Sequence, residues 1–223
     1  MANLAEALCA VVPAFNEAPY LGAVLEVLTL LEELERITVV DDGSEDGTAE
    51  AAQRWTERDS RVRLLRLPVN GGKAAAMTAG AEVSPADLVV FLDADLLGLR
   101  PEHVRALAGL VTAGRCEMTV GVFRGGRLAT DFTQAAAPVL SGQRCLRWSL
   151  FRDAPDLCSA RGGAEVALSL HARRRGYRVR RVPLPGVTHV MKHEKQAWLP
   201  GRAAHARMFG EIFRYLAEHV RRR

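Results

Sequence analysis

The first half of the chain alternates short apolar runs with longer stretches in which apolar residues recur at helical spacing. Runs that are apolar on both faces and rich in valine and leucine are typical of buried parallel strands. We expect four such strands, at residues 8–13, 37–40, 62–67 and 88–92. The stretches between them predict helices at 18–35, 46–58 and 72–83. This alternation predicts an α/β fold with a mostly parallel, Rossmann-like sheet flanked by helices.

The second half of the chain is less regular. Its predicted elements are strands at 117–123 and 143–151, a helix at 164–175, a basic strand at 177–183 and a loop or broken segment at 185–200. Residues 202–220 predict an amphipathic terminal helix, because apolar and charged side chains fall on opposite faces. No Gly-, Pro- or Ser-rich linker separates the halves. We therefore expect a single domain over 1–223, with one lobe at 1–96 and another at 97–223.

The formal net charge of +4 conceals a sharp division between the halves. Residues 1–96 carry 7 Lys and Arg against 17 Asp and Glu, a balance of −10, whereas residues 97–223 carry 23 against 9, a balance of +14. Such an asymmetry points to an anionic partner or a charged substrate. The longest stretch without a charged residue, 132–143, is much shorter than the ~20 residues that a membrane span needs, so we expect no integral membrane segment. Four cysteines without C-x-x-C spacing, and no signal-peptide pattern, predict a cytoplasmic setting without zinc or disulfides.

A polar loop follows each predicted strand of the first half. These loops are 13–17 (Pro-Ala-Phe-Asn-Glu), 41–48 (Asp-Asp-Gly-Ser-Glu-Asp-Gly-Thr), 70–73 (Asn-Gly-Gly-Lys) and 93–95 (Asp-Ala-Asp). In an open parallel sheet, ligands bind at the carboxyl ends of the strands, so the loops predict one binding site. Two common nucleotide motifs are excluded: no two glycines stand two positions apart, and the Gly72–Lys73 pair lacks the other residues of a P-loop.

Asp93 and Asp95 directly follow an apolar strand and face the expected ligand edge. Two carboxylates this close would repel each other unless a cation bridges them. Carboxylate oxygens together with diphosphate oxygens suit Mg²⁺ or Mn²⁺ better than zinc. The sequence therefore predicts a Mg²⁺ or Mn²⁺ site. The alternative, that one of these residues only caps a helix starting near Pro101, stays open at this point.

The order and content of these loops resemble the successive signatures of family 2 glycosyltransferases. The segments that carry the resemblance are 11–17, 40–48, 70–80 and 91–95. The resemblance implies an inverting enzyme of the GT-A fold. Further on, 141–144 (Ser-Gly-Gln-Arg) resembles the acceptor-side motif of polyprenyl-phosphate glycosyltransferases of the dolichol-phosphate mannosyltransferase type. The chain departs from that group at Leu97, where glutamine is usual, and at Gly163, where an acidic residue is common.

The resemblance implies roles for individual residues. Those that would hold the nucleobase and ribose of a nucleotide-sugar donor are Pro13, Phe15, Glu17 and Asp42. Lys73 would lie near the base or the diphosphate. Asp93 would touch the ribose or the metal, and Asp95 would coordinate the Mg²⁺ or Mn²⁺ that clamps the diphosphate. Residues 1–96 would then form the donor lobe, and 97–223 the acceptor lobe with its terminal helix.

The acceptor could belong to either of two chemical classes. A hydroxyl acceptor needs a carboxylate to take its proton, and Glu165 is the candidate base. A phosphate acceptor is already ionised, and Arg144, Arg147 or Arg161 would position it. The alternatives are an ordinary exposed helical glutamate for Glu165 and a surface arginine for Arg144.

We expect the chain to transfer a hexose from a nucleotide-sugar to a lipid-linked phosphate or a cell-envelope glycan. A UDP-sugar is the favoured donor, and GDP-mannose comes next. Three rivals stay open: transfer to a soluble or protein hydroxyl, a nucleotidyltransferase, and a non-catalytic nucleotide-sugar-binding partner subunit. A nucleotidyltransferase would usually carry a glycine-rich basic loop after the first strand, where this chain has residues 13–17.

Two basic segments near the C-terminus have open roles. Within 188–195, His189 or His193 would complete the metal shell, or the segment is a solvated loop. The helix at 202–220 either contacts anionic lipid or packs on the protein's own lobe. We therefore expect a cytoplasmic protein, or one peripheral on the inner face of the membrane. Nucleic acid is not an expected partner, because the arginines lack interleaved aromatic residues and the acidic half would repel a phosphate backbone.

Overall fold

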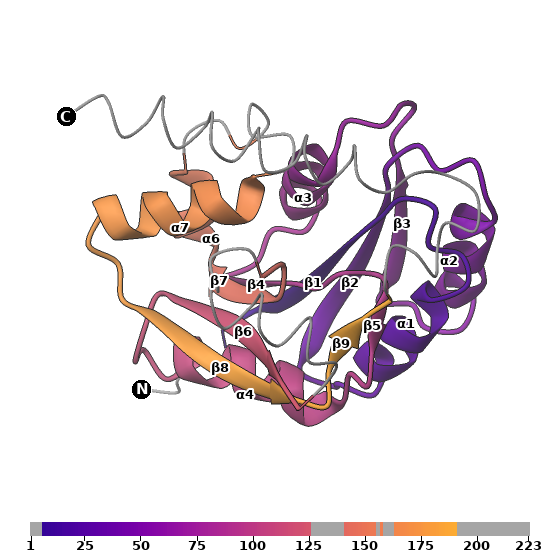
Figure 1. Ribbon diagram of the computed structural model, residues 1–223. Helices are drawn as coiled ribbons and strands as arrows, with labels where there is room; N and C mark the ends of the chain where they lie inside the picture. The colour runs from indigo at the N-terminus through magenta and orange to yellow at the C-terminus, as the bar shows by residue number, and fades with distance from the viewer. Residues whose placement is uncertain (1–5, 126–140, 155–156, 158–162, 191–223) are drawn as a thin grey trace.

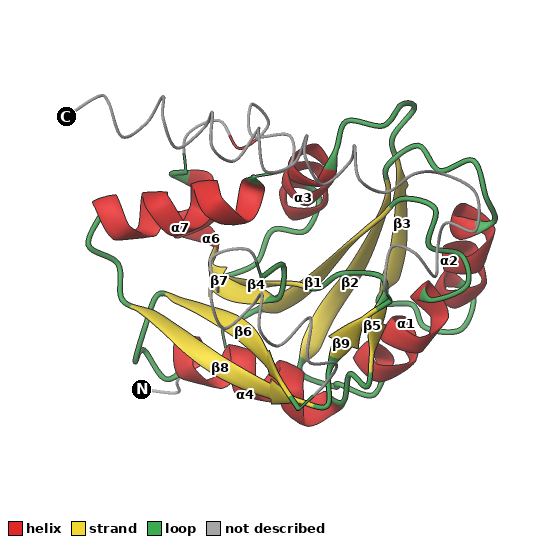
Figure 2. Cartoon of the chain, viewed as in Figure 1, coloured by secondary structure: helices red, strands yellow, loops and turns green. Residues whose placement is uncertain are grey.

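The computed structural model describes residues 6–125, 141–154, 157 and 163–190. At its centre lies a seven-stranded sheet in the order β3-β2-β1-β4-β7-β6-β8 (Figures 1 and 2). The strands are β1 Leu8–Ala14, β2 Leu34–Asp41, β3 Val62–Arg66, β4 Leu88–Phe91, β6 Met118–Arg124, β7 Arg144–Arg147 and β8 Val179–Pro185. A separate two-stranded sheet pairs β5 Leu96–Leu97 with β9 Thr188–His189.

Helices cover both faces of the large sheet. They are α1 Leu21–Thr29, α2 Thr48–Thr56, α3 Lys73–Glu82, α4 Pro101–Thr112, α6 Trp148–Arg152 and α7 Ala164–Arg174. Side chains of α1, α2 and α4 share one core with one face, whereas α3, α6 and α7 share a second core with the other. In β1, Ala10 and Val12 belong to the first core and Val11 to the second. Both faces of β1 are buried, which explains its unbroken apolar run.

The strand directions confirm a mostly parallel sheet. Strands β3, β2, β1 and β4 are parallel to one another. β7 runs antiparallel to both β4 and β6, and β8 is parallel to β6. The second half of the chain therefore completes the sheet that the first half begins.

Two predicted elements differ most from the observed ones, and the loop expected at 185–200 contains strand β9. The helix expected at 18–35 ends at Thr29, and β2 starts at Leu34. The strand expected at 143–151 is β7 followed by the short helix α6. Leu150 and Phe151 are both buried in the same core. A strand would send two adjacent side chains to opposite faces, whereas a helical turn places both on one side.

Parts of the C-terminal predictions lie outside the described residues. These are the terminal helix at 202–220, His193 and the larger part of the loop expected at 185–200. Within the ranges that the structure describes, no helix combines the length and the apolar character needed to cross a membrane.

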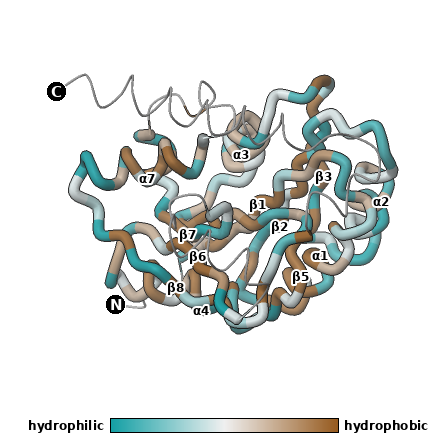
Figure 3. The backbone as a smooth tube through the Cα atoms, in the orientation of Figure 1, coloured by the Kyte–Doolittle hydropathy of each residue, from teal (hydrophilic) through white to brown (hydrophobic). Residues whose placement is uncertain are grey.

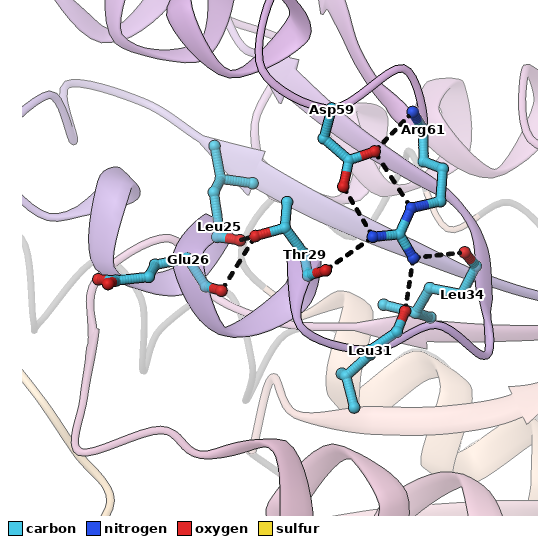
Figure 4. A network of polar contacts seen from close by, with 7 residues as sticks. All are labelled: Leu25, Glu26, Thr29, Leu31, Leu34, Asp59 and Arg61. Atoms are coloured by element: carbon cyan, nitrogen blue, oxygen red, sulfur yellow. Dashed lines mark hydrogen bonds and ion pairs between the residues drawn. The ribbon is translucent and has the colours of Figure 1, made fainter.

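Arg61 fastens the end of α1 to the start of β3 (Figure 4). Its guanidinium donates to the carbonyl oxygens of Thr29 at 2.7 Å, Leu31 at 2.6 Å and Leu34 at 3.2 Å. It also pairs with Asp59 at 2.7 Å, and this hydrogen bond lowers the pKa of the Asp59 carboxyl. The last carbonyls of a helix have no partner within the helix, so Arg61 supplies donors that the backbone lacks.

Replacing Arg61 by Ala is expected to lower the free energy of unfolding by about 2–3 kcal/mol, because several partly buried acceptors lose a charged donor. Urea denaturation followed by circular dichroism measures the change. Arg63→Ala, at an exposed position of β3, is the matched control and should shift stability by less than about 0.5 kcal/mol. Equal losses in the two variants would show that the hydrogen bonds of Arg61 contribute nothing specific.

Candidate active site

A buried carboxylate holds the loop that precedes α3. Asp42, just after β2, accepts the N–H groups of Gly71 and Gly72, one on each oxygen and both at 2.8 Å. Gly72 has a φ of 87°, in the left-handed region that favours glycine. α3 then begins at Lys73. We expected Asp42 to contact a nucleobase. The structure shows it anchoring this loop, and the nucleobase contact stays a prediction.

The other residues expected beside the base lie at the end of β1 and just after it. Pro13 is in β1, Phe15 is 44% exposed, and the Glu17 N–H donates to Thr48 Oγ1 at 2.8 Å. The Asp42 N–H donates to the carbonyl of Ala14 at 2.9 Å, which holds the loops after β1 and β2 together. These residues therefore share one edge of the sheet with Asp42.

Lys73 lies between two carboxylates from distant parts of the chain. Its ammonium pairs with Asp93, which follows β4, and with Glu165 Oε1 at 2.6 Å, in the first turn of α7. Burial alone would lower the pKa of Lys73, but the charges of Asp93 and Glu165 outweigh it and raise that pKa. Burial would raise the pKa of Asp93, but Lys73 and His189 lower it. The alternative of an exposed helical glutamate is wrong, because Glu165 is buried.

Asp95 and His189 lie beside this ion pair. The pairing of β5 with β9 sets Leu96 opposite His189. The imidazole Nδ1 then lies 3.2 Å from Asp95 Oδ1, and Nε2 lies 3.7 Å from Asp93 Oδ2. Burial alone would lower the pKa of His189, but the two carboxylates raise it. The alternative that Asp93 or Asp95 caps α4 is wrong, because Arg100 is the cap residue.

The three side chains form a group that could hold a metal ion. One ligand atom from each of Asp93, Asp95 and His189 lies within 4.8 Å of the others. Carboxylate oxygens are the ligands that Mg²⁺ and Mn²⁺ prefer, and an imidazole nitrogen also suits Mn²⁺. The residues therefore fit the cation that the sequence predicts.

Residues 141–143 cover the pair formed by Lys73 and Asp93. Gln143, which is fully buried, donates from Nε2 to Asp93 Oδ2 at 2.8 Å, and Ser141 Oγ donates to Gln143 Oε1 at 3.0 Å. A Cβ added to Gly142 would lie 2.6 Å from both Asp93 oxygens and would also overlap Lys73 Nζ. Neither role was predicted, because a glycine and an uncharged amide give no electrostatic signal in a sequence.

Arg144 lies behind this cluster, with its side chain fully buried. Its Nε donates to the carbonyl of Ser141 at 2.8 Å, and Nη1 donates to Ser169 Oγ at 2.9 Å. Burial lowers the pKa of Arg144 to about 10, while the charges of Glu165 and Asp93 act in the opposite direction. The alternative of a surface arginine is therefore wrong.

Arg147 does not join the cluster. Its Nη1 pairs with Glu6 at 2.6 Å, and its Nη2 donates to the carbonyl of Val111 in α4 at 3.3 Å. Because α4 covers the face of the sheet opposite α7, these contacts contradict the expectation that Arg147 positions an acceptor. Arg161, the third arginine considered, lies outside the described residues.

The sheet order, the acidic pair after β4 and the helices on both faces define the GT-A class of fold. The fold matches that of glucosyl-3-phosphoglycerate synthase from Mycobacterium tuberculosis, solved in complex with Mn²⁺, UDP and glucosyl-3-phosphoglycerate, with a TM-score of 0.73. The two sequences are 24% identical, and the match covers 95% of this chain and 79% of the synthase. The fold expected from the sequence is confirmed.

Residues 9–166 match the model of glycosyl transferase family 2, and the chain belongs to this family. It is 38% identical over 94 residues to a dolichyl-phosphate beta-glucosyltransferase of Trichomonas vaginalis, a match that covers 38% of this chain and 28% of that protein. It is 41% identical over 109 residues to an undecaprenyl-phosphate 4-deoxy-4-formamido-L-arabinose transferase of Pseudomonas aeruginosa, covering 47% and 32%. The chain thus matches about a third of the length of these curated relatives.

Proposed function

We propose that the protein is a metal-dependent, inverting glycosyltransferase. It moves a hexose from a nucleotide-sugar to a lipid-linked phosphate or a cell-envelope glycan. The favoured donor is a UDP-sugar, and GDP-mannose is the next candidate. The observation that carries this proposal is the convergence of Asp93, Asp95 and His189 with Lys73 and Glu165 at one edge of the sheet. The names of the two curated relatives support a polyprenyl-phosphate acceptor. The Mn²⁺ and UDP bound to the synthase support the metal and the donor.

The contacts of Asp93 suggest which residues would bind the metal ion. Both oxygens of Asp93 are engaged by the chain, one by Lys73 and the other by Gln143. We therefore assign the main metal contacts to Asp95 and His189, with Asp93 beside them. Mg²⁺ or Mn²⁺ held there would neutralise the leaving diphosphate. Lys73, held in place by its two carboxylates, supplies a fixed positive charge at the same place.

Glu165 is the proposed base when the acceptor is a hydroxyl. It is buried and lies next to Lys73, within the cluster that would surround the reacting groups. Arg144 is buried behind it and contributes its charge from there. This arrangement supports the second candidate function, transfer to a soluble or protein hydroxyl. A phosphate acceptor would need no base.

Replacing Glu165 by Gln is expected to separate these two acceptor classes. Transfer to a hydroxyl should fall about 10²–10⁴-fold, because the amide cannot accept the proton. Transfer to a polyprenyl phosphate should fall far less. The measurement is kcat with each acceptor, and Glu82→Gln, at an exposed position of α3, is the matched control. Unchanged rates with every acceptor that the protein uses would remove Glu165 from the mechanism.

Thermal-shift measurements with UDP, GDP and their sugar conjugates, each with Mn²⁺ or Mg²⁺, test the donor assignment. A nucleotide at about 100 times its Kd stabilises the folded state by about 2.7 kcal/mol. Stabilisation by none of them would contradict the proposal. Stabilisation without sugar transfer or hydrolysis would favour the non-catalytic binding subunit instead.

A further inference from the structure

Six arginines gather where α7 leads into β8. Six of the nine residues from 173 to 181 are arginine, namely Arg173, Arg174, Arg175, Arg178, Arg180 and Arg181. All six are exposed. The sequence contains no Asp or Glu between Glu165 and Glu194, so the segment that carries the six arginines has no acidic residue of its own. We call these six residues the arginine patch.

The strand packed beside the arginine patch has no acidic residue at its paired positions. Arg178 pairs with Glu117 at 2.6 Å. The adjacent strand β6 sets the uncharged residues 118–120 opposite 179–181. β8 is the outermost strand of the sheet, so the patch lies along an edge of the molecule (Figure 1). Figure 3 shows hydrophilic backbone at the end of α7 and again in β8.

Two residues of the arginine patch, Arg173 and Arg174, lie on the same helix as the proposed base. Glu165 is in the first turn of α7 and Arg174 is its last residue. At about 1.5 Å per residue, about 14 Å of helix separates them. A phosphate layer against the patch would therefore contact the end of α7 opposite the proposed base.

The chemistry of the arginine patch favours a bilayer over RNA. Planar guanidinium groups bind phosphate well, and clustered arginines are attracted to anionic lipids. Val179, which is 39% exposed, adds apolar surface between the arginines, whereas Tyr177 is only partly exposed. Single-stranded RNA would need exposed aromatic rings on which its bases can stack.

We propose that the arginine patch docks the protein on an anionic lipid surface. The choice of a lipid surface rests on the proposed lipid-linked acceptor. Docking through α7 and β8 would hold the protein at the surface that carries the acceptor, and the patch would act independently of the residues that bind the donor.

Sedimentation of the full chain with phosphatidylcholine vesicles, containing or lacking phosphatidylglycerol, tests this proposal. The wild type should bind only the vesicles that contain phosphatidylglycerol. Each arginine near an anionic surface contributes about 1 kcal/mol, or about a five-fold change in binding. The triple variant Arg173→Glu, Arg175→Glu and Arg181→Glu should therefore lose about 100-fold or more in vesicle partitioning.

The matched control changes the net charge by the same amount at the opposite edge of the sheet. It carries Arg54→Glu, Arg58→Glu and Arg63→Glu, at exposed positions of α2, the loop after it and β3. This variant should keep much more of its binding than the patch variant. Equal losses in both variants, or no loss in the patch variant, would overturn the proposal. So would binding of single-stranded RNA by the wild type without binding to either vesicle.

Thermal shifts with UDP and Mn²⁺ on the same samples keep the two proposals apart. Both triple variants should retain the wild-type shift, because neither changes a residue of the active site. If no nucleotide stabilises any sample while vesicle binding follows the expected pattern, the donor assignment fails and the lipid-binding surface stands. If UDP and Mn²⁺ give the wild-type shift but the patch variant binds vesicles as well as the wild type, the donor assignment stands and the lipid-binding surface fails.

Discussion

The Asp95→Asn variant is expected to lose about 1,000-fold in Mn²⁺-dependent sugar transfer. Asparagine keeps the size of the side chain but removes the negative charge that would hold the cation beside His189. A bound cation stabilises a developing diphosphate by several kcal/mol, and about 4 kcal/mol corresponds to about 1,000-fold in rate. Two measurements check this expectation, the transfer rate across a Mn²⁺ titration and the thermal shift that UDP produces with Mn²⁺.

Two further variants show whether the effect belongs to the metal site. Asp153→Asn removes an exposed carboxylate at the end of α6 and should leave both measurements unchanged. His189→Ala should raise the Mn²⁺ concentration needed for half-maximal activity, because it removes one of the two main proposed ligands. A Mn²⁺ titration that is the same in Asp95→Asn, His189→Ala and the wild type would discard the assigned metal site.

Replacing Gly142 by Ala is expected to disrupt the active site with only one added carbon atom. The new Cβ would overlap both oxygens of Asp93 and the ammonium of Lys73. Gln143 and Lys73 hold Asp93 from two sides, so the ion pair must open or the covering segment must move. A displacement of about 1 Å in an active site can cost about 100-fold in rate. We expect kcat to fall by about that factor, and the free energy of unfolding by about 1–3 kcal/mol.

Gly109→Ala is the matched control for this substitution. Gly109 lies in α4, and a Cβ added there would meet no atom within 4 Å. Alanine is the better helix former by up to about 1 kcal/mol, so this variant should be as stable as the wild type or more so, with unchanged activity. Equal activity in Gly142→Ala and the wild type would show that activity does not depend on the close approach of residues 141–143 to Asp93 and Lys73.

The parallel strands were predictable because burial on both faces gives them a continuous apolar run. The boundary between α1 and β2 was not, because Leu31 and Leu34 are as apolar as the helix before them, and both are buried. At the end of the helix the carbonyls of Thr29 and Leu31 accept hydrogen bonds from Arg61, which lies about 30 positions further along the chain. A contact of that kind cannot be derived from local spacing.

In the candidate site, too, some features follow from the local sequence and others depend on contacts between distant parts of the chain. Asp93 and Asp95 could be singled out from the sequence because they directly follow a buried strand. The position of Lys73 between Asp93 and Glu165 depends on how α3 and α7 pack on one face of the sheet, which no local pattern encodes. Residues 141–144 were singled out by resemblance, but the close approach of Gly142 to Asp93 and Lys73 was not predicted, because it depends on a side chain that glycine lacks.

The pairing of β5 with β9 has a consequence for the folding of the chain. It brings together Asp95 and His189, which are 94 positions apart in the sequence. A cation held by both side chains would bind the folded chain in preference to the unfolded one, and would therefore stabilise the fold. The cation would then act as a reversible cross-link between the acidic and the basic halves, and a chelator would loosen the protein before any substrate arrives.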